Sequence, residues 1–288
     1  MAVADLVGSI MTIGVSGANG NLGSRVVARL AAVGAPQRLL LRDVARAPQA
    51  PGAELAVIGG YTDAERLVPA LRGLDAVLMV SGREAPDRLA QHEAFVDAAA
   101  AAGVGHIVYT SFYGAAPDAV FSHGRLHWAT EEYIRASGVP FTFLRDNLYA
   151  DFLPHLAGAD GVIRGPAGDG QVSAVAQQDI AEVAAVVLQE PTRHSGAAYD
   201  MTGPEDWSLT DIAALLTASL GKPIRYHDET LAEARASRAV YGAPDWEVDA
   251  WISTYTAVAA GEMAGVAGDI PDLIGRPATA LTELFPPG

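Results

Sequence analysis

Short, continuous apolar runs alternate with longer stretches of helical spacing along the first 190 residues. The apolar runs predict strands at residues 11–16, 38–41, 54–58, 75–80, 106–110 and 140–144. The stretches between them predict helices at residues 20–33, 63–72, 87–103 and 127–138. Strands that are apolar on both sides and separated by helices predict a parallel sheet buried on both faces. Right-handed crossovers then give a doubly wound α/β fold with helices on both faces.

The pattern loosens after Arg145. Residues 165–171 are rich in turn formers, 177–191 predict a helix, and 198–203 predict a strand. Residues 208–221 predict a further helix with Ser208 as its cap and Gly221 as its end, and 222–230 predict a strand and a turn. We therefore predict four regions: a nucleotide-binding core over 11–150, a segment 176–203 that returns to it, a smaller C-terminal α/β lobe over 151–175 and 204–288, and a tail over 1–10.

Glycines are concentrated where the first predicted strand turns into the first helix. In "TIGVSGANGNLGSRVV", Gly17, Gly20 and Gly23 have the spacing G-x-x-G-x-x-G. The first glycine allows a sharp turn, the second lets a pyrophosphate approach the helix N-terminus, and the third lets the helix pack close to the strand. Because the motif lies between a strand and a helix, it predicts a dinucleotide site. The alternative is a glycine-rich turn that binds nothing.

Both acidic and basic residues follow the second strand, in "LLLRDVARAP". An acidic residue here would bind the ribose 2′-hydroxyl of NAD(H), and an arginine would bind the 2′-phosphate of NADP(H). Arg42 follows the strand directly and Arg46 lies about one turn further on, so two cations oppose the single carboxylate of Asp43. We therefore expect NADP(H) to be preferred, while NAD(H) remains an alternative through Asp43, and ordinary surface charge is another.

Composition removes several other classes of function. The 288 residues carry a formal net charge of −15, which disfavours contact with nucleic acid. There is no cysteine, so cysteine nucleophiles and cysteine–zinc sites are excluded, and a reducing cytoplasm is compatible. No apolar run reaches the length of a membrane span, and the first residues make a poor signal peptide.

Several longer motifs follow one another in a recognisable order. "VSGANGNLG", "LLLRD", "HIVYTSFYGA", "RASGVPFTFLRDNLYADF" and "GDGQVSAVAQQDIAEVA" resemble the NmrA-like subgroup of atypical short-chain dehydrogenases, and within it most closely the bacterial type 2 quinone oxidoreductases. The resemblance extends from Met11 to Leu284. It implies a Rossmann domain that binds NADP(H), a small C-terminal lobe and a cleft between them.

The resemblance also implies roles for matching positions. The pyrophosphate would lie against Gly17, Ala18, Asn19, Gly20, Asn21, Leu22 and Gly23. The remaining cofactor contacts would come from Arg42, Ser81, Gly82, Thr110, Ser111 and Asn147, with Tyr149 bordering the nicotinamide and the substrate. Candidate walls of the acceptor site are Phe112, Tyr113, Tyr149 and Phe152. Tyr149 could instead be a packed aromatic, and Ser111 could simply cap a turn.

The usual acid–base pair of short-chain dehydrogenases is missing. That pair is Tyr-x-x-x-Lys on a helix, but the single lysine is Lys222 and residue 218 is alanine. At the equivalent helix this chain has His127, which together with Tyr149 is our candidate catalytic residue. We predict that His127 hydrogen-bonds ribose or substrate; the alternative is a helix-surface histidine. His123 and His127 could share a helix face, but without a third ligand we predict no metal site.

A reductase that lacks this proton donor is restricted in its acceptors. A quinone that takes hydride gives a resonance-stabilised anion that water can protonate, so the protein mainly holds donor and acceptor in contact. We therefore predict an NADPH-dependent oxidoreductase of the cytoplasm, acting on a quinone-like small molecule, with homodimer formation compatible. The alternative is a non-catalytic NADP(H)-binding redox sensor.

Overall fold

The computed structural model describes residues 11–288, and the predicted tail 1–10 lies outside the described residues. The chain divides into two compact units. Unit 1 contains the chain up to Thr110, Tyr133–Phe143 and Ala181–Ala197; unit 2 contains Ser111–Glu132, Leu144–Ile180 and Ala198–Gly288. The division passes through two strands of the main sheet, so the chain crosses between the units more often than the predicted bounds imply. Those predicted bounds stay a prediction.

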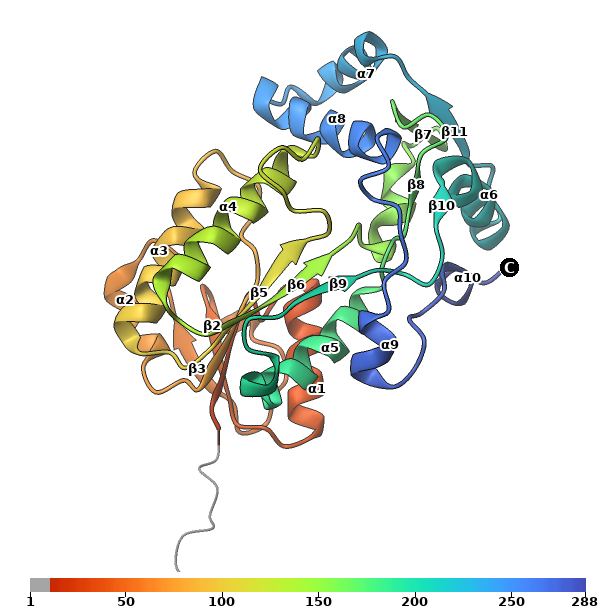
Figure 1. The fold of residues 1–288 in the computed structure, drawn as a ribbon. Coiled ribbons are helices and arrows are strands. Elements are labelled where there is room, and N and C mark those ends of the chain that lie inside the picture. The colour runs from red at the N-terminus through yellow and green to blue at the C-terminus, as the bar shows by residue number, and fades with distance from the viewer. Residues whose placement is uncertain (1–10) are drawn as a thin grey trace, which may run out of the picture. The chain divides into compact units, whose positions relative to one another are not determined.

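A seven-stranded parallel sheet carries the fold (Figure 1). Its strands are β1 (Ile13–Ser16), β2 (Gln37–Leu41), β3 (Glu54–Val57), β4 (Ala76–Met79), β5 (Ile107–Phe112), β6 (Phe141–Asp146) and β9 (Ala198–Met201). Their order in the sheet is β3-β2-β1-β4-β5-β6-β9. The order reverses between β2 and β4, on either side of β1, which is the arrangement of a doubly wound sheet. The predicted fold class is therefore confirmed.

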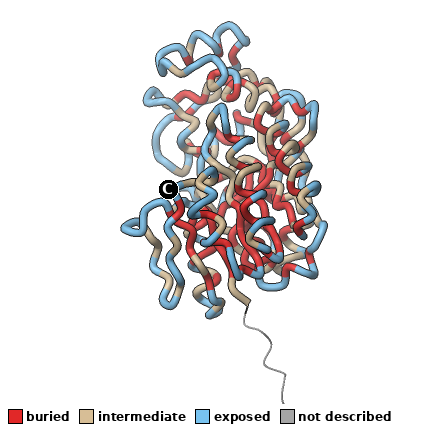
Figure 2. Tube along the Cα trace, turned by 90° about the vertical axis from the view of Figure 1, so that its left-hand side faces the viewer, coloured by how far each residue is buried: buried red, intermediate tan, exposed pale blue. Residues whose placement is uncertain are grey.

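Helices lie on both faces of this sheet, as predicted. They are α1 (Asn21–Ala32), α2 (Ala64–Leu71), α3 (Arg88–Ala102), α4 (Ser122–Ser137) and α5 (Gln177–Gln189). In unit 1, α2 and α3 cover one face and bury Leu67, Leu71 and Phe95 against the strands. The other face is covered by α1 and α5, which an ion pair joins. Every residue of β1 and β4 is buried, which explains their continuous apolar sequence. Buried residues, drawn red in Figure 2, lie in the interior of the trace, and the exposed residues lie at its outside.

Two strands run further than the sequence pattern predicts. The fifth and sixth strands were expected to end at Thr110 and Leu144, but β5 continues to Phe112 and β6 to Asp146. The additional residues include the polar side chains of Ser111, Arg145 and Asp146, which broke the apolar pattern. Each of the three has a hydrogen-bond partner in unit 2, so polar residues can extend these strands without an unpaired side chain.

Unit 2 adds smaller elements. They are β7 (Val162–Gly165), β8 (Gln171–Val172), β10 (Trp207–Ser208), α6 (Leu209–Leu220), β11 (Arg225–Asp228), α7 (Leu231–Arg238), α8 (Asp245–Ala259), α9 (Asp269–Ile274) and α10 (Leu281–Leu284). The predicted cap is confirmed: Ser208 accepts a hydrogen bond from the Asp211 backbone, and α6 ends at Gly221. The strand predicted at 222–230 is β11, which pairs in parallel with β7. The sequence pattern missed β7, β8 and β10.

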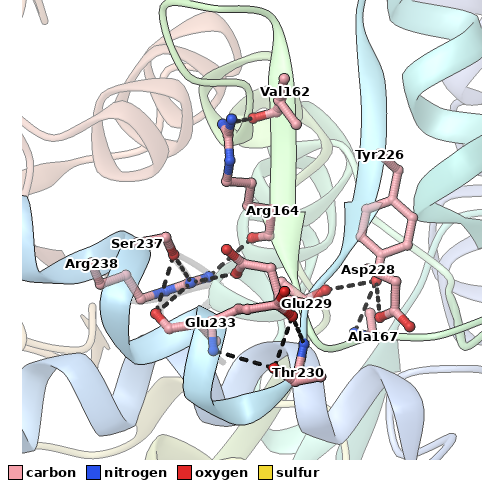
Figure 3. Close-up of polar contacts among 12 residues, drawn as sticks. Val162, Arg164, Ala167, Tyr226, Asp228, Glu229, Thr230, Glu233, Ser237 and Arg238 are labelled. Atoms are coloured by element: carbon pink, nitrogen blue, oxygen red, sulfur yellow. Dashed lines mark hydrogen bonds and ion pairs between the residues drawn. The ribbon is translucent and has the colours of Figure 1, made fainter.

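A buried ion pair fixes α7 to this small sheet (Figure 3). Arg238 donates to the Glu229 carboxylate at 2.8 Å and to the carbonyl oxygen of Arg164 in β7 at 3.0 Å. The two side chains are 8% and 2% exposed, and the guanidinium also lies 5.2 Å from the ring centre of Tyr255. Each charge is therefore desolvated and paired, which makes loss of either partner costly.

Candidate active site

The glycine loop of unit 1 adopts a backbone conformation that a residue with a Cβ atom would strain or clash with. Gly17 has a φ of +59°, and the Gly20 N–H donates to its carbonyl oxygen at 2.8 Å. A Cβ on Gly23 would lie 2.2 Å from that same oxygen. The loop is therefore folded tightly against the first turn of α1, as the motif predicts.

The N-terminus of α1 is open. Gly20 stands at the cap position with no side chain capping the helix, and the first turn contains no acidic residue. Gly20 and Asn21 are exposed, Asn19 is half-buried, and Ala18 and Leu22 are packed inside. The free N–H groups and the positive end of the helix dipole suit a phosphate. These features fit the pyrophosphate of a dinucleotide.

The charged residues after β2 divide into two roles. Asp43 accepts a hydrogen bond from the Ala45 N–H at 3.0 Å and caps the short 3-10 helix Val44–Arg46. Arg42 and Arg46 are exposed. One oxygen of the single carboxylate therefore serves the backbone, while two guanidinium groups face solvent, an arrangement that favours a 2′-phosphate over a bare ribose.

The ends of β4 and β5 are joined by a hydrogen bond. The Ser81 N–H donates to the Thr110 hydroxyl at 2.8 Å, and the Gly82 N–H donates to His92 Nε2 at 2.9 Å. Burial lowers the pKa of His92 to about 3, with the Arg88 charge adding to this, so the ring is a neutral acceptor. Sequence reasoning gave His92 no role, because nothing local marks a helix residue that holds a distant loop.

In unit 2, a carboxylate joins β5, β6 and α4. Glu131, which has no exposed surface, accepts from the Ser111 hydroxyl at 2.6 Å and from two Arg145 nitrogens at 2.9 and 2.7 Å. The hydrogen bonds to Glu131 raise the pKa of Arg145. Ser111, which the resemblance predicted as a cofactor contact, thus donates its hydroxyl proton to Glu131. The sequence signal that was missed is the spacing of Glu131 four residues after His127.

The predicted substrate residues differ in their surroundings. His127 is 5% exposed and its ring centre lies 6.0 Å from that of Phe112, which packs against the core of unit 2. The Tyr113 hydroxyl donates to the Ala264 carbonyl oxygen at 3.0 Å, whereas Phe152 is 58% exposed. Because α4 begins at Ser122, His123 and His127 do lie on one helix. Their roles stay predictions.

The loop after β6 holds the last predicted residues. Asn147 is 1% exposed and donates to the Ser173 hydroxyl and to the Met263 carbonyl oxygen, both at 3.0 Å. Its own oxygen accepts from the Leu148 N–H, so the amide holds unit 2 together, and its predicted contact with a cofactor is untested. The Tyr149 hydroxyl donates to Asp146 at 3.0 Å. Asp146 was not among the predicted site residues.

Other kinds of site find no support in residues 11–288. Their His, Asp and Glu side chains form no group of three that could hold a metal ion. None of their helices combines the length and the apolar character needed to cross a membrane. A cavity of about 450 Å³ in unit 1 lies at the amino ends of four strands, next to Met11, Asp75, His106 and Pro140, and contains none of the predicted site residues.

The doubly wound sheet and the glycine loop before an open helix N-terminus define a Rossmann-type α/β protein. The family model described as "NmrA-like family" matches residues 10–236, and the chain belongs to this family. The resemblance read from the sequence motifs is thereby confirmed.

Named relatives cover nearly the whole chain. An NAD(P)H azoreductase of Xenophilus azovorans is 34% identical over 93% of this chain and 95% of its own length. The structure is similar to an NADPH complex of an NADPH-dependent quinone oxidoreductase from Escherichia coli, with a TM-score of 0.85, 31% identity and coverage of 95% and 98%. It is also similar to a triphenylmethane reductase of Citrobacter sp. complexed with NADP(H), with a TM-score of 0.82, 30% identity and coverage of 94% and 98%.

Proposed function

We propose that this chain is an NADPH-dependent oxidoreductase that transfers hydride to a quinone or a similar conjugated acceptor. The observation that carries the proposal is the glycine loop together with the exposed Arg42 and Arg46. The loop leaves an uncapped helix N-terminus for a pyrophosphate, and the arginines leave positive charge for a 2′-phosphate. Bound NADPH would supply the hydride.

The class of acceptor is supported by the missing Tyr-x-x-x-Lys pair and by the relatives. An acceptor whose reduced form is a stabilised anion depends less on a strong proton donor than an alcohol or a ketone does. The relatives named above act on azo compounds, quinones or triphenylmethane dyes by their names, and all of these acceptors are conjugated.

Steady-state oxidation of NADPH and of NADH with a panel of quinones tests the proposal. In Arg42→Ala we expect the KM for NADPH to rise roughly 10- to 100-fold, the size of a lost charge-assisted hydrogen bond, with kcat nearly unchanged. The KM for NADH should not change. Arg72→Ala removes another exposed arginine of unit 1 and serves as the matched control.

Two outcomes contradict the proposal in different ways. Tight NADPH binding without turnover of any acceptor would favour the redox-sensor alternative. An unchanged KM for NADPH in Arg42→Ala would remove the assigned 2′-phosphate site. Cytoplasmic location and homodimer formation stay predictions, the second open to sedimentation analysis.

A further inference from the structure

A carboxyl group with a single hydrogen-bond partner in the described part of the chain is buried at the end of β6. Asp146 is 2% exposed, and its Oδ2 accepts from the Tyr149 hydroxyl at 3.0 Å. Its Oδ1 is buried with no hydrogen-bond partner among residues 11–288. An ionised carboxylate offers about four lone-pair sites and is stabilised by several donors or by a cation. One hydroxyl is too little, so this environment favours the neutral acid.

The nearest arginine in the sequence does not compensate Asp146. The side chain of Arg145 points to Glu131, with which it forms a bidentate ion pair. Burial raises the pKa of Asp146 well above its usual range, and the hydrogen bond from Tyr149 opposes this only in part. The carboxyl group therefore favours its protonated form, which is the form that can release a proton to a neighbouring oxygen.

Tyr149 is held in place by its backbone. The Ala150 N–H donates to the Val175 carbonyl oxygen at 2.8 Å, and the Val175 N–H donates to the Leu148 carbonyl oxygen at 2.9 Å. This bridge fixes the turn after β6 on both sides of Tyr149, so its hydroxyl returns to Asp146 three residues earlier. Tyr149 itself is only half-buried. One end of the pair is sealed from solvent, while the phenol retains exposed surface.

We propose that Tyr149 donates a proton to the reduced acceptor and that Asp146 positions and recharges it, taking the place of the missing Tyr-x-x-x-Lys pair. This inference rests on the proposed function. Tyr149 is the catalytic residue, since it would contact the acceptor, and Asp146 is a positioning residue that acts through it.

The proton balance of this step is simple. Transfer of hydride to the acceptor leaves an oxyanion on it. For this step the neutral acid carries its proton on Oδ2 and donates it to the Tyr149 oxygen along the same 3.0 Å contact, so that the Tyr149 O–H is directed at the acceptor. The Tyr149 O–H bond breaks as a new O–H bond forms on the oxyanion, and the Oδ2–H bond of Asp146 breaks as the Tyr149 O–H bond is restored. Because Asp146 is buried, its proton is replaced through the half-buried Tyr149: a solvent proton binds the Tyr149 oxygen as the Tyr149 proton passes to the carboxylate. Each turnover therefore consumes one hydride and one proton.

Three variants test the inference. Tyr149→Phe removes the donor, and Asp146→Asn keeps the shape and an acceptor oxygen for Tyr149 but has no proton to release. Asp118→Asn, at an exposed position of unit 2, is the matched control. We expect kcat for a quinone to fall about 100-fold or more in the first two variants, with the Kd for NADPH nearly unchanged.

A second measurement needs no turnover. The infrared spectrum of the protein without cofactor, recorded at neutral pH, should contain the carbonyl band of a protonated carboxylic acid. Subtracting the spectrum of each variant from that of the wild-type protein shows whether the band belongs to the substituted residue. The band should persist in Asp118→Asn and disappear in Asp146→Asn. If Asp146→Asn does not fold, as judged by circular dichroism, the relay is tested by kcat in Tyr149→Phe and by the pH titration of this band in the wild-type protein.

The outcomes separate this inference from the function on which it rests. Absence of turnover in the wild-type protein refutes the proposed function, and the proton relay with it. Turnover in the wild-type protein with unchanged kcat in Tyr149→Phe and Asp146→Asn refutes the relay alone. A missing carboxylic-acid band at neutral pH refutes the role of Asp146.

Discussion

Replacing Gly23 by alanine is the sharpest test of how the glycine loop is built. The new Cβ would lie 2.2 Å from the Gly17 carbonyl oxygen, 2.7 Å from its carbon and 3.1 Å from the Ala18 Cα. All three atoms belong to the backbone, so the clash cannot be relieved by rotating a side chain. Overpacking of this kind costs about 3 kcal/mol. We therefore expect Tm to fall by roughly 6 to 12 °C, measured by calorimetry.

Gly20→Ala is the matched control, because it separates the fold from the ligand. Its Cβ would meet only the Gly17 oxygen, at 3.2 Å, and its φ of −83° suits alanine. We expect its Tm to change little, because the gain from a stiffer unfolded chain offsets the poorer cap. Its Kd for NADPH should rise at least about tenfold, since the Cβ occupies the approach of the pyrophosphate. A Gly23→Ala protein as stable as the wild type would refute this account of the loop.

Three further predictions concern buried charge. Arg238→Ala strands Glu229 in the core and should lower the free energy of unfolding by about 3 to 5 kcal/mol in urea, whereas Arg235→Ala breaks an exposed ion pair and should cost at most about 1 kcal/mol; equal losses would contradict the distinction. Glu131→Ala leaves the Ser111 hydroxyl and the Arg145 guanidinium without their acceptor and should lower the free energy of unfolding by about 3 kcal/mol. An unchanged free energy of unfolding in the same urea titration would show that Glu131 does not stabilise the fold. The folded pKa of His92, about 3, lies below that of the unfolded chain, 6.5, so stability should fall as the pH drops from 6.5 towards 3, by roughly 2 kcal/mol at pH 5. In His92→Gln, the urea midpoint should depend less on pH between pH 6.5 and 3 than it does in the wild-type protein. An unchanged pH dependence would show that His92 is not its cause.

Local patterns in the sequence determine the frame of this protein. Continuous apolar runs are sufficient to locate the strands of a sheet buried on both faces, and the glycine spacing locates the loop before α1, because both depend on neighbouring residues. The cap at Ser208 and the absence of Tyr-x-x-x-Lys can be read in the same way. The prediction of an NmrA-like oxidoreductase rested on such motifs, and the family is confirmed.

Only the tertiary structure determines which polar side chains are buried and which groups they bind. Glu131 gains its importance from partners on two strands, and His92 from a loop ten residues away in sequence. Asp146 is the clearest case: in sequence it is a polar residue after an apolar run, where solvent exposure is the default expectation. Only the packed fold removes water from its carboxyl group and leaves Tyr149 as its partner, because burial depends on what the rest of the chain places around a residue.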